Sequence, residues 1–198
     1  MPIDLPLTPG PANADPYFID AGGWQRPTTT GPATRVDMLG DRFGVAVQLP
    51  PMQEPEALAW VKALNKGRGE GVTFEFPANY DLPVNDIGTP AEIRSISVAQ
   101  ATTIDLRFVG VNVTFEDGRF ISINSGGHNY LHQVDGEQII DGNGLLNIFP
   151  RTRAAFSVAD PVMIDRPKID GILLGNQSDW TVNAALHYGL SFTIEEME

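Results

Sequence analysis

The stretch Phe120-Ile-Ser-Ile-Asn-Ser-Gly-Gly-His-Asn-Tyr-Leu-His-Gln-Val134 carries the pattern that decides the fold. Two short apolar runs, Phe120–Ile123 and Tyr130–Val134, stand on either side of the turn residues Ser-Gly-Gly at 125–127. Runs of this kind, bounded by Gly, Asn and Ser, indicate strands joined by a turn. The stretch therefore predicts two consecutive β-strands.

The same rhythm fills the chain from about residue 86 to residue 175. Strand-like segments alternate there with turn residues such as Asp117-Gly118 and Asp135-Gly136. This alternation is typical of a small β-sandwich or barrel. The strands predicted in this part are Ile93–Val98, Ile104–Val109, Asn112–Phe115, Phe120–Ile123, Tyr130–Val134, Gln138–Ile140, Leu145–Ile148, Pro161–Ile164 and Gly171–Leu174.

Residues 34–49 predict a hairpin. Thr34–Leu39 is the first strand, residues 40–42 (Gly-Asp-Arg) form the turn, and Phe43–Leu49 is the second strand. Apolar side chains alternate along the second strand, which is the period of a half-buried strand. The same alternation predicts strands at Val72–Phe76 and Leu190–Ile194, and Glu195-Glu196 is expected to end the latter in solvent.

A single helix is predicted between the hairpin and Val72. Pro55 fits the first helical position, acidic residues precede and follow it, and Gly67 can form the left-handed C-terminal cap. The apolar stripe expected to face the core comprises Ala57, Leu58, Val61 and Leu64, with Trp60 beside it.

Residues 1–33 predict a tether. They contain seven prolines, which cannot donate to a sheet ladder, together with apolar residues such as Tyr17, Phe18 and Trp24 that need a surface to bury against. We expect an arm that docks either on its own core or on a neighbouring subunit.

Charge and composition exclude several functions. A net charge of −12 disfavours nucleic-acid binding, which needs Lys and Arg at the phosphates, and also disfavours binding to an anionic membrane. The acidity fits ordinary solubility, or a pore wall past which DNA slides without sticking. The absence of cysteine excludes disulfides and thiolate sites. No signal peptide or membrane span is apparent, so we expect a soluble protein made in a cytosol.

No motif predicts catalysis, and neither an enzyme nor a cofactor is expected. His128 and His132 have a spacing that would share a helix face, but their surroundings resemble a strand and no metal-protease pattern is present. Residues 141–144 (Asp-Gly-Asn-Gly) resemble part of a calcium loop, but they are more typical of a tight turn. The glycine-rich residues 67–71 follow a helix, the reverse of a phosphate-binding loop, and predict a connector.

The order of these segments resembles the distal tail and minor tail proteins of long-tailed bacteriophages. The motifs that carry the resemblance are residues 69–77 (Gly-Glu-Gly-Val-Thr-Phe-Glu-Phe-Pro) after the helix and residues 188–196 (Tyr-Gly-Leu-Ser-Phe-Thr-Ile-Glu-Glu) at the end. The matching positions are Trp60, Phe74, Pro77, Phe192, Glu195 and Glu196. Residues 118–153 also resemble a β domain that some relatives carry. The resemblance covers most of residues 34–198, and the arm at 1–33 is not accounted for.

The resemblance implies a fold and a role. The fold is a mainly β, tail-tube-like barrel or sandwich with one flanking helix, formed by residues 34–85 and 176–198, with a second small β domain inserted at 86–175. The role is a structural virion protein at the tail tip that forms a ring, usually of six copies, and lines the DNA channel. Its partners would be copies of itself, the tail-tube protein and the tip hub or fibre proteins.

A ring would cover the exposed edges of such a barrel by symmetry, and the strands at 34–39 and 43–49 are the expected subunit contact. The candidate interface residues are Trp24, Arg35, Asp37, Phe43, Val45, Val47, Arg151 and Arg153. Two alternatives remain open. One is a carbohydrate-binding module with a platform of Trp24, Tyr130, His132 and Trp180, and the other is a glycan hydrolase or peptidase.

Overall fold

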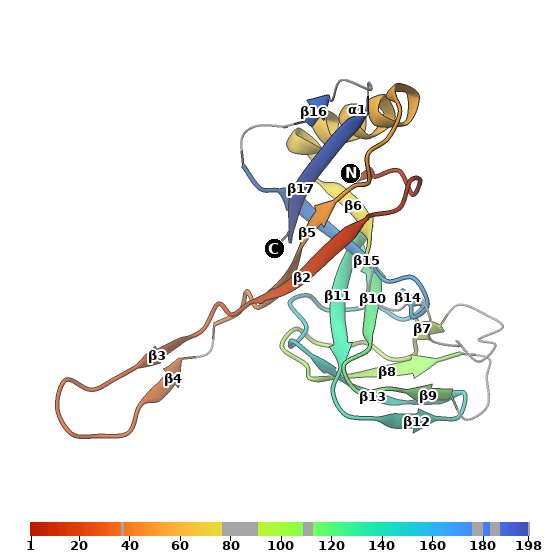
Figure 1. Ribbon diagram of the computed structural model, residues 1–198. Coiled ribbons are helices and arrows are strands. Elements are labelled where there is room, and N and C mark those ends of the chain that lie inside the picture. Colours follow the sequence, from red (N-terminus) through yellow and green to blue (C-terminus); the bar gives the residue numbers. More distant parts are fainter. Residues whose placement is uncertain (37, 77–90, 109–112, 176–179, 183–186, 198) are drawn as a thin grey trace.

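The computed structural model describes residues 1–36, 38–76, 91–108, 113–175, 180–182 and 187–197 (Figure 1). The fold is mainly β with one helix in the described residues. Pro77, Asp37 and the expected domain boundary at 85/86 lie outside the described residues. The strands fall into a seven-stranded sheet, a closed six-stranded barrel and two small two-stranded pairs.

The seven-stranded sheet gathers segments from both ends of the chain. Its order is β1-β6-β15-β17-β5-β2, and β16 adds to β17. The C-terminal strand β17 is central and pairs antiparallel with both β5 and β15. The strands are β1 (Ile3–Asp4), β2 (Asn13–Ile19), β5 (Arg42–Gln48), β6 (Val72–Glu75), β15 (Lys168–Leu173), β16 (Trp180–Val182) and β17 (Tyr188–Glu196).

The helix α1 (Glu54–Glu70) begins with a proline in its first turn, as the sequence predicts. Two details of that prediction are wrong. The helix continues past Gly67, and the cap is Gly71, whose φ of 81° is favourable for glycine and whose N–H bonds to the Gly67 carbonyl. Leu58 is exposed, and the buried face consists of Ala57, Trp60, Leu64 and Gly67.

The barrel lies between β6 and β15 in the chain. Its order is β10-β11-β13-β8-β7-β14, and a separate pair joins β9 and β12. It has its own core, which includes Ile93, Leu106, Ile121 and Phe156. The strands are β7 (Ala91–Ile93), β8 (Thr103–Arg107), β9 (Val113–Phe115), β10 (Phe120–Ser125), β11 (His128–Val134), β12 (Gln138–Ile140), β13 (Asn143–Phe149) and β14 (Pro161–Met163).

Three expectations about pairing differ from the structure. Residues 34–39 do not form a hairpin with β5, because β4 (Thr34–Val36) pairs with β3 (Gly23–Gln25) and β5 pairs with β2. Residues 1–33 are not only a tether, because β1 and β2 are strands of the sheet. The expected inserted domain extends to residue 175 and so includes β15. In the structure β15 instead belongs to the sheet, where it pairs with β6 and β17. Local patterns predict strands but not their partners.

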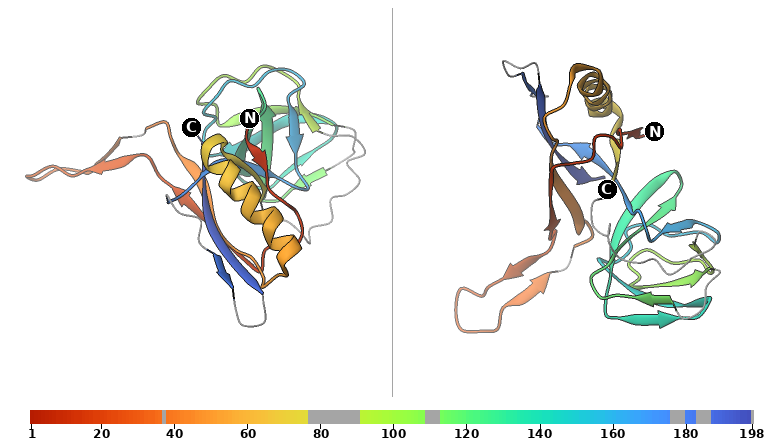
Figure 2. Two further views of the ribbon diagram at one scale, coloured as in Figure 1. Left: turned by 90° about the horizontal axis from the view of Figure 1, so that it is seen from above. Right: turned by 45° about the vertical axis from the view of Figure 1, so that its right-hand side comes forward.

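The helix and the barrel cover the same face of the sheet (Figure 2). Trp60 of α1 packs on Phe192, and Phe120 of β10 packs on Phe43. The register places Phe192 opposite Val47, so both aromatic contacts lie on one side of the sheet. The opposite side of β2, β5 and β17 therefore has neither helix nor barrel over it.

Candidate assembly surface

The uncovered side of the sheet is polar and is called the open face here. Alternation along the strands sends small and hydrophilic side chains to this side, while the apolar ones enter the core. Asp15 lies opposite Ala46, which lies opposite Thr193, so one row crosses three strands. The open face comprises Asn13, Asp15, Tyr17, Ala46, Gln48, Ser191, Thr193 and Glu195.

One end of the open face is closed by a small network around Tyr17. The Tyr17 hydroxyl donates to Glu195 at 3.4 Å, and Arg42 pairs with the same carboxylate at 3.6 Å. Burial, followed by the charge of Glu195, raises the pKa of Tyr17. The tyrosine ring lies over Gly44, where a Cβ would stand only 2.5 Å from it. Glycine at position 44 therefore lets the ring lie flat on the sheet.

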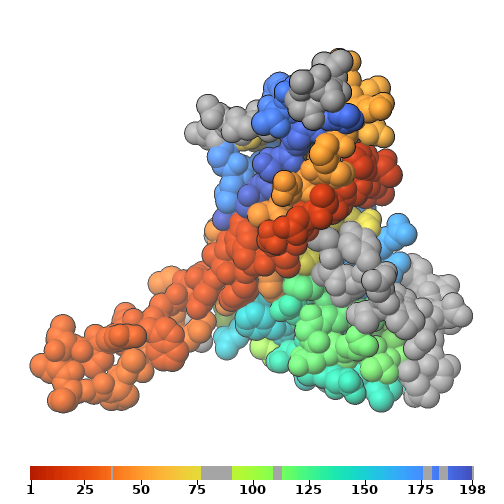
Figure 3. Space-filling view, viewed as in Figure 1, coloured from red at the N-terminus to blue at the C-terminus, as the bar shows by residue number. Residues whose placement is uncertain are grey.

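A β-hairpin of β3 and β4 projects from the sheet beyond the end of β2 and β5 (Figures 1 and 3). From here on, the word arm means residues 21–36 and no longer the whole of residues 1–33. Trp24 lies opposite Arg35 in its ladder and is 63 % exposed. Met38 and Leu39, at the base of the arm, are exposed as well. An isolated two-stranded ribbon is marginally stable in water, so the arm lacks the support that a third strand or a core would provide.

A cavity of about 830 Å³ lies at the opposite end of the sheet. Its apolar lining comes from α1, β15 and β17 and includes Leu64, Leu173 and Phe192. Trp180 of β16 contributes a half-exposed ring, and Asp15 places a carboxylate at the lining. The lining also includes Arg68 of α1, which donates to the Gly175 carbonyl, so the cavity combines an apolar wall with one acidic and one basic side chain.

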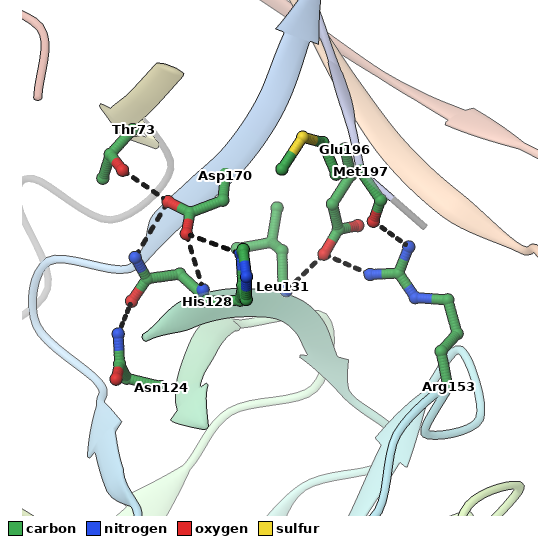
Figure 4. Close-up of polar contacts among 9 residues, drawn as sticks. Thr73, Asn124, His128, Leu131, Arg153, Asp170, Glu196 and Met197 are labelled. Atoms are coloured by element: carbon green, nitrogen blue, oxygen red, sulfur yellow. Dashed lines mark hydrogen bonds and ion pairs between the residues drawn. The ribbon is translucent and has the colours of Figure 1, made fainter. Parts of the chain in front are cut away.

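Two buried carboxylates hold the barrel against the sheet, and Figure 4 shows their contacts. Asp170 of β15 accepts from the backbone N–H of Asn129 at 2.9 Å, from the Asn129 side chain at 2.9 Å and from the Thr73 hydroxyl at 2.6 Å. His128 stands 4.0 Å from the same carboxylate. These contacts saturate the aspartate, which is 3 % exposed, and give it a structural role.

Glu196 of β17 is the second of these carboxylates. It accepts from the backbone N–H of Leu131 at 2.8 Å and of Phe43 at 3.3 Å, and it forms an ion pair with Arg153. Burial raises the pKa of Glu196, while Arg153 and the two backbone donors act in the opposite direction. The expectation that Glu196 ends the chain in solvent is wrong, since it is 2 % exposed.

The sequence contains a pattern that indicates the buried position of Glu196. Leu190, Phe192 and Ile194 alternate on the core side of β17, and the same period places Glu196 on that side and Glu195 on the other. No comparable pattern pointed to Asp170, because its partners come from strands distant in the chain.

The eight candidate interface residues are not gathered in one place. Phe43, Val45 and Val47 are buried in the core of a strand that is paired on both sides. Trp24 and Arg35 lie on the arm, where Arg35 pairs with Asp20 at 3.0 Å. Asp37 lies outside the described residues. Arg151 and Arg153 differ sharply. Arg151 is exposed, whereas Arg153 belongs to the buried ion pair.

The histidines and turn residues occupy structural positions. His132 is fully buried on β11, and its Nδ1 lies 3.0 Å from the Pro150 carbonyl. Burial, followed by the charge of Arg153, lowers its pKa to about 3, so the ring is neutral. Asp141 and Gly142 connect β12 to β13, which begins at Asn143. Among the described residues, no group of three or more His, Asp or Glu side chains could hold a metal ion.

The four residues of the expected sugar platform are dispersed. Trp24 lies on β3, Tyr130 and the buried His132 lie on β11, and Trp180 lies on β16. In Figure 1 the elements β3 and β16 stand at opposite ends of the molecule. These side chains therefore do not form one surface.

Comparison with known proteins gave no family assignment: a scan against protein-family models and a search of curated proteins found no match. In the described part of the chain, no helix combines the length and apolarity needed to cross a bilayer.

Proposed function

We propose that the protein is a non-catalytic structural subunit that assembles into a ring at the distal end of a phage tail. In this role the ring joins the tail tube to the tip hub and surrounds the DNA channel. The observation that carries the proposal is the combination of an uncovered polar sheet face with an arm that projects from the end of the same sheet (Figures 2 and 3). A ring would use both features, with the face as part of its wall and the arm as a contact between copies.

The placement of the C-terminal strand supports the proposal. The resemblance to tail proteins depends on the first and last strand segments closing one helix-flanked barrel. In the structure these segments join one helix-flanked sheet, in which β17 pairs with β5 and β15 pairs with β6, and the closed barrel is formed by other strands.

The chemistry of the open face also supports the proposal. A wall in contact with passing DNA must not bind phosphates, and the open face presents hydroxyl, amide and carboxylate groups with Arg42 already paired to Glu195. The net charge of −12 has the sign that repels DNA.

Native mass spectrometry and negative-stain electron microscopy of the purified full chain test this function. The measurements are made on the protein alone and mixed with the tail-tube protein encoded by the same phage. We expect a closed ring in at least one of these samples. A strictly monomeric protein under both conditions, at concentrations up to about 100 μM, which is far above the range of specific assembly, would overturn the proposal.

A further inference from the structure

The β-ladder is interrupted where the arm joins the sheet. The ladder of β2 and β5 ends at Ile19 and Arg42, whereas the ladder of β3 and β4 begins only at Gly23 and Val36. The connection is three residues long on the β2 side and five on the β5 side, so the two ladders cannot continue into each other in register. The described residues of this connection, which we call the joint, are 20–22 and 38–41.

Two aspartate side chains hold the joint together where the ladder is interrupted. Asp41 accepts from the backbone N–H of Ala21 at 2.8 Å and so links the two sides of the joint. Asp20 accepts from the backbone N–H of Gly22 at 2.8 Å and from the Arg35 side chain at 3.0 Å. Hydrogen bonds to an ionised acceptor are stronger than those between neutral groups. The two carboxylates therefore take the place of backbone pairs at the base of the arm.

Little else in the described chain fixes the direction of the arm. The strands β3 and β4 pair with each other and with no other described strand, and the arm extends away from both sheet and barrel (Figure 3). The apolar residues of the joint, Met38 and Leu39, are 61 % and 57 % exposed and border a cavity of about 280 Å³ beside the barrel. Packing at the base is therefore loose, and the polar contacts of the joint become decisive.

Glycines at two positions permit this geometry. A Cβ at Gly22 would stand 3.0 Å from the Oδ1 of Asp20 and 3.0 Å from the carbonyl oxygen of Val36. Gly40 has a φ of 138°, a conformation that favours glycine, and its carbonyl accepts from Arg42 at 3.3 Å. The chain can therefore turn closely enough at the joint for the carboxylates to reach their donors.

From these observations we propose that the joint is a hinge closed by carboxylates. Asp20 and Asp41 hold the arm in one direction, and the arm swings relative to the sheet when their contacts open. The hinge is a property of the single subunit and does not depend on the proposed ring. In a contact between copies, a preset direction of the arm would reduce the conformational entropy lost on assembly.

Double electron–electron resonance on the dilute full-length chain tests the hinge, since a chain without cysteine allows labels to be placed freely. One spin label is attached at Gln25→Cys on β3 and the other at Ser191→Cys on β17, both exposed positions. We expect a narrow distance distribution with the joint intact. Asp41→Ala should broaden it to about twice its width, because Ala21 loses its acceptor, and Asp20→Ala should broaden it likewise.

Three controls separate the hinge from the fold. Asp15→Ala removes an exposed aspartate of β2 that accepts from Asn13 outside the joint, and it should leave the distribution unchanged. Asp41→Asn keeps an oxygen acceptor for the backbone N–H and should restore most of the narrow distribution. A second pair of labels, at Ser191→Cys and Glu137→Cys, joins sheet to barrel and should give the same distance in every variant.

The hinge and the ring fail in distinguishable ways. A broad distribution in the unmodified joint, or no broadening in Asp20→Ala and Asp41→Ala, would show that the carboxylates do not set the direction of the arm. Equal broadening in Asp15→Ala would show the same. These results leave the ring untouched, and the ring is wrong if the unmodified chain never assembles.

Discussion

Glu196 at the end of β17 accepts a hydrogen bond from the backbone N–H of Leu131 on β11 at 2.8 Å, and this contact joins the sheet to the barrel. Asp170 likewise accepts a hydrogen bond from the backbone N–H of Asn129 on β11. Two carboxylates from the sheet therefore bind main-chain donors along β11. Such donors would otherwise be unpaired at a strand edge. The barrel is therefore held by directional bonds as well as by the packing of Phe120 on Phe43.

Loss of the arginine in this junction should be costly. Arg153→Met leaves the carboxylate of Glu196 buried without its cation, and we expect a loss of about 3 kcal/mol in the free energy of unfolding, measured by urea denaturation. Arg151→Met is the matched control, because that side chain is exposed, and should change stability by less than about 0.5 kcal/mol. Adding Glu196→Gln to Arg153→Met should recover part of the loss, and equal effects of the two arginine substitutions would contradict the assignment.

The stability of the protein should fall in mild acid through His132. The unfolded chain protonates this ring near its ordinary pKa of 6.5, whereas the folded protein does so only at about 3. A lowered folded pKa means that the stabilisation is complete above pH 6.5 and is lost as the pH falls toward 3, by about 1.4 kcal/mol per pH unit.

Comparison with His132→Gln isolates this histidine from the carboxylates that titrate in the same range. Between pH 7 and pH 5 the unmodified protein should lose about 2 kcal/mol more than the variant, because only it must bury a histidine that would otherwise be charged. Parallel curves of unfolding free energy against pH would show that His132 is protonated, or accessible, in the folded protein.

Two glycines of α1 should respond to alanine with opposite signs. Gly69→Ala meets no atom within 4 Å and should stabilise the protein by about 0.5 kcal/mol, because alanine is the better helix former. A Cβ at Gly67 would collide with the Val72 side chain, so Gly67→Ala should cost about 1–2 kcal/mol despite the same gain in propensity. Thermal unfolding of the two variants tests the packing of α1 on β6, and stabilisation by both would refute it.

The buried face of α1 can be tested with two leucines. Leu64 is 4 % exposed and Leu58 is 53 % exposed. Leu64→Ala should lower the unfolding free energy by about 3 kcal/mol, whereas Leu58→Ala should cost less than about 0.5 kcal/mol. Chemical denaturation provides the measurement, and similar large losses for both substitutions would restore the helical stripe predicted from the sequence, which includes both leucines.

The apolar pattern of α1 does not determine which side of the helix is buried, and the exposed Leu58 is the example. Ala57, Leu58, Val61 and Leu64 satisfy a helical period, but so does a face centred on Trp60 and including Gly67, and the apolar pattern alone does not choose between them. The choice is made by the sheet, where Phe192 offers a ring to Trp60 and Val72 fills the space over Gly67.

Many strand positions after residue 34, the helix in the described residues and the mainly β class followed from the sequence, because alternation, turn residues and a proline at a helix start are local properties of the chain; the strands within residues 1–33 did not. The partners of the strands did not follow from the sequence. Backbone hydrogen bonds are made by the same groups in almost every residue, so a strand such as β5 can pair with any strand of suitable register. Tertiary structure alone decided that β2 occupies that edge, that residues 21–36 project, and that Asp170 and Glu196 bind the barrel. Each of these joins residues far apart in the chain, where only the packing of the whole molecule sets the distance.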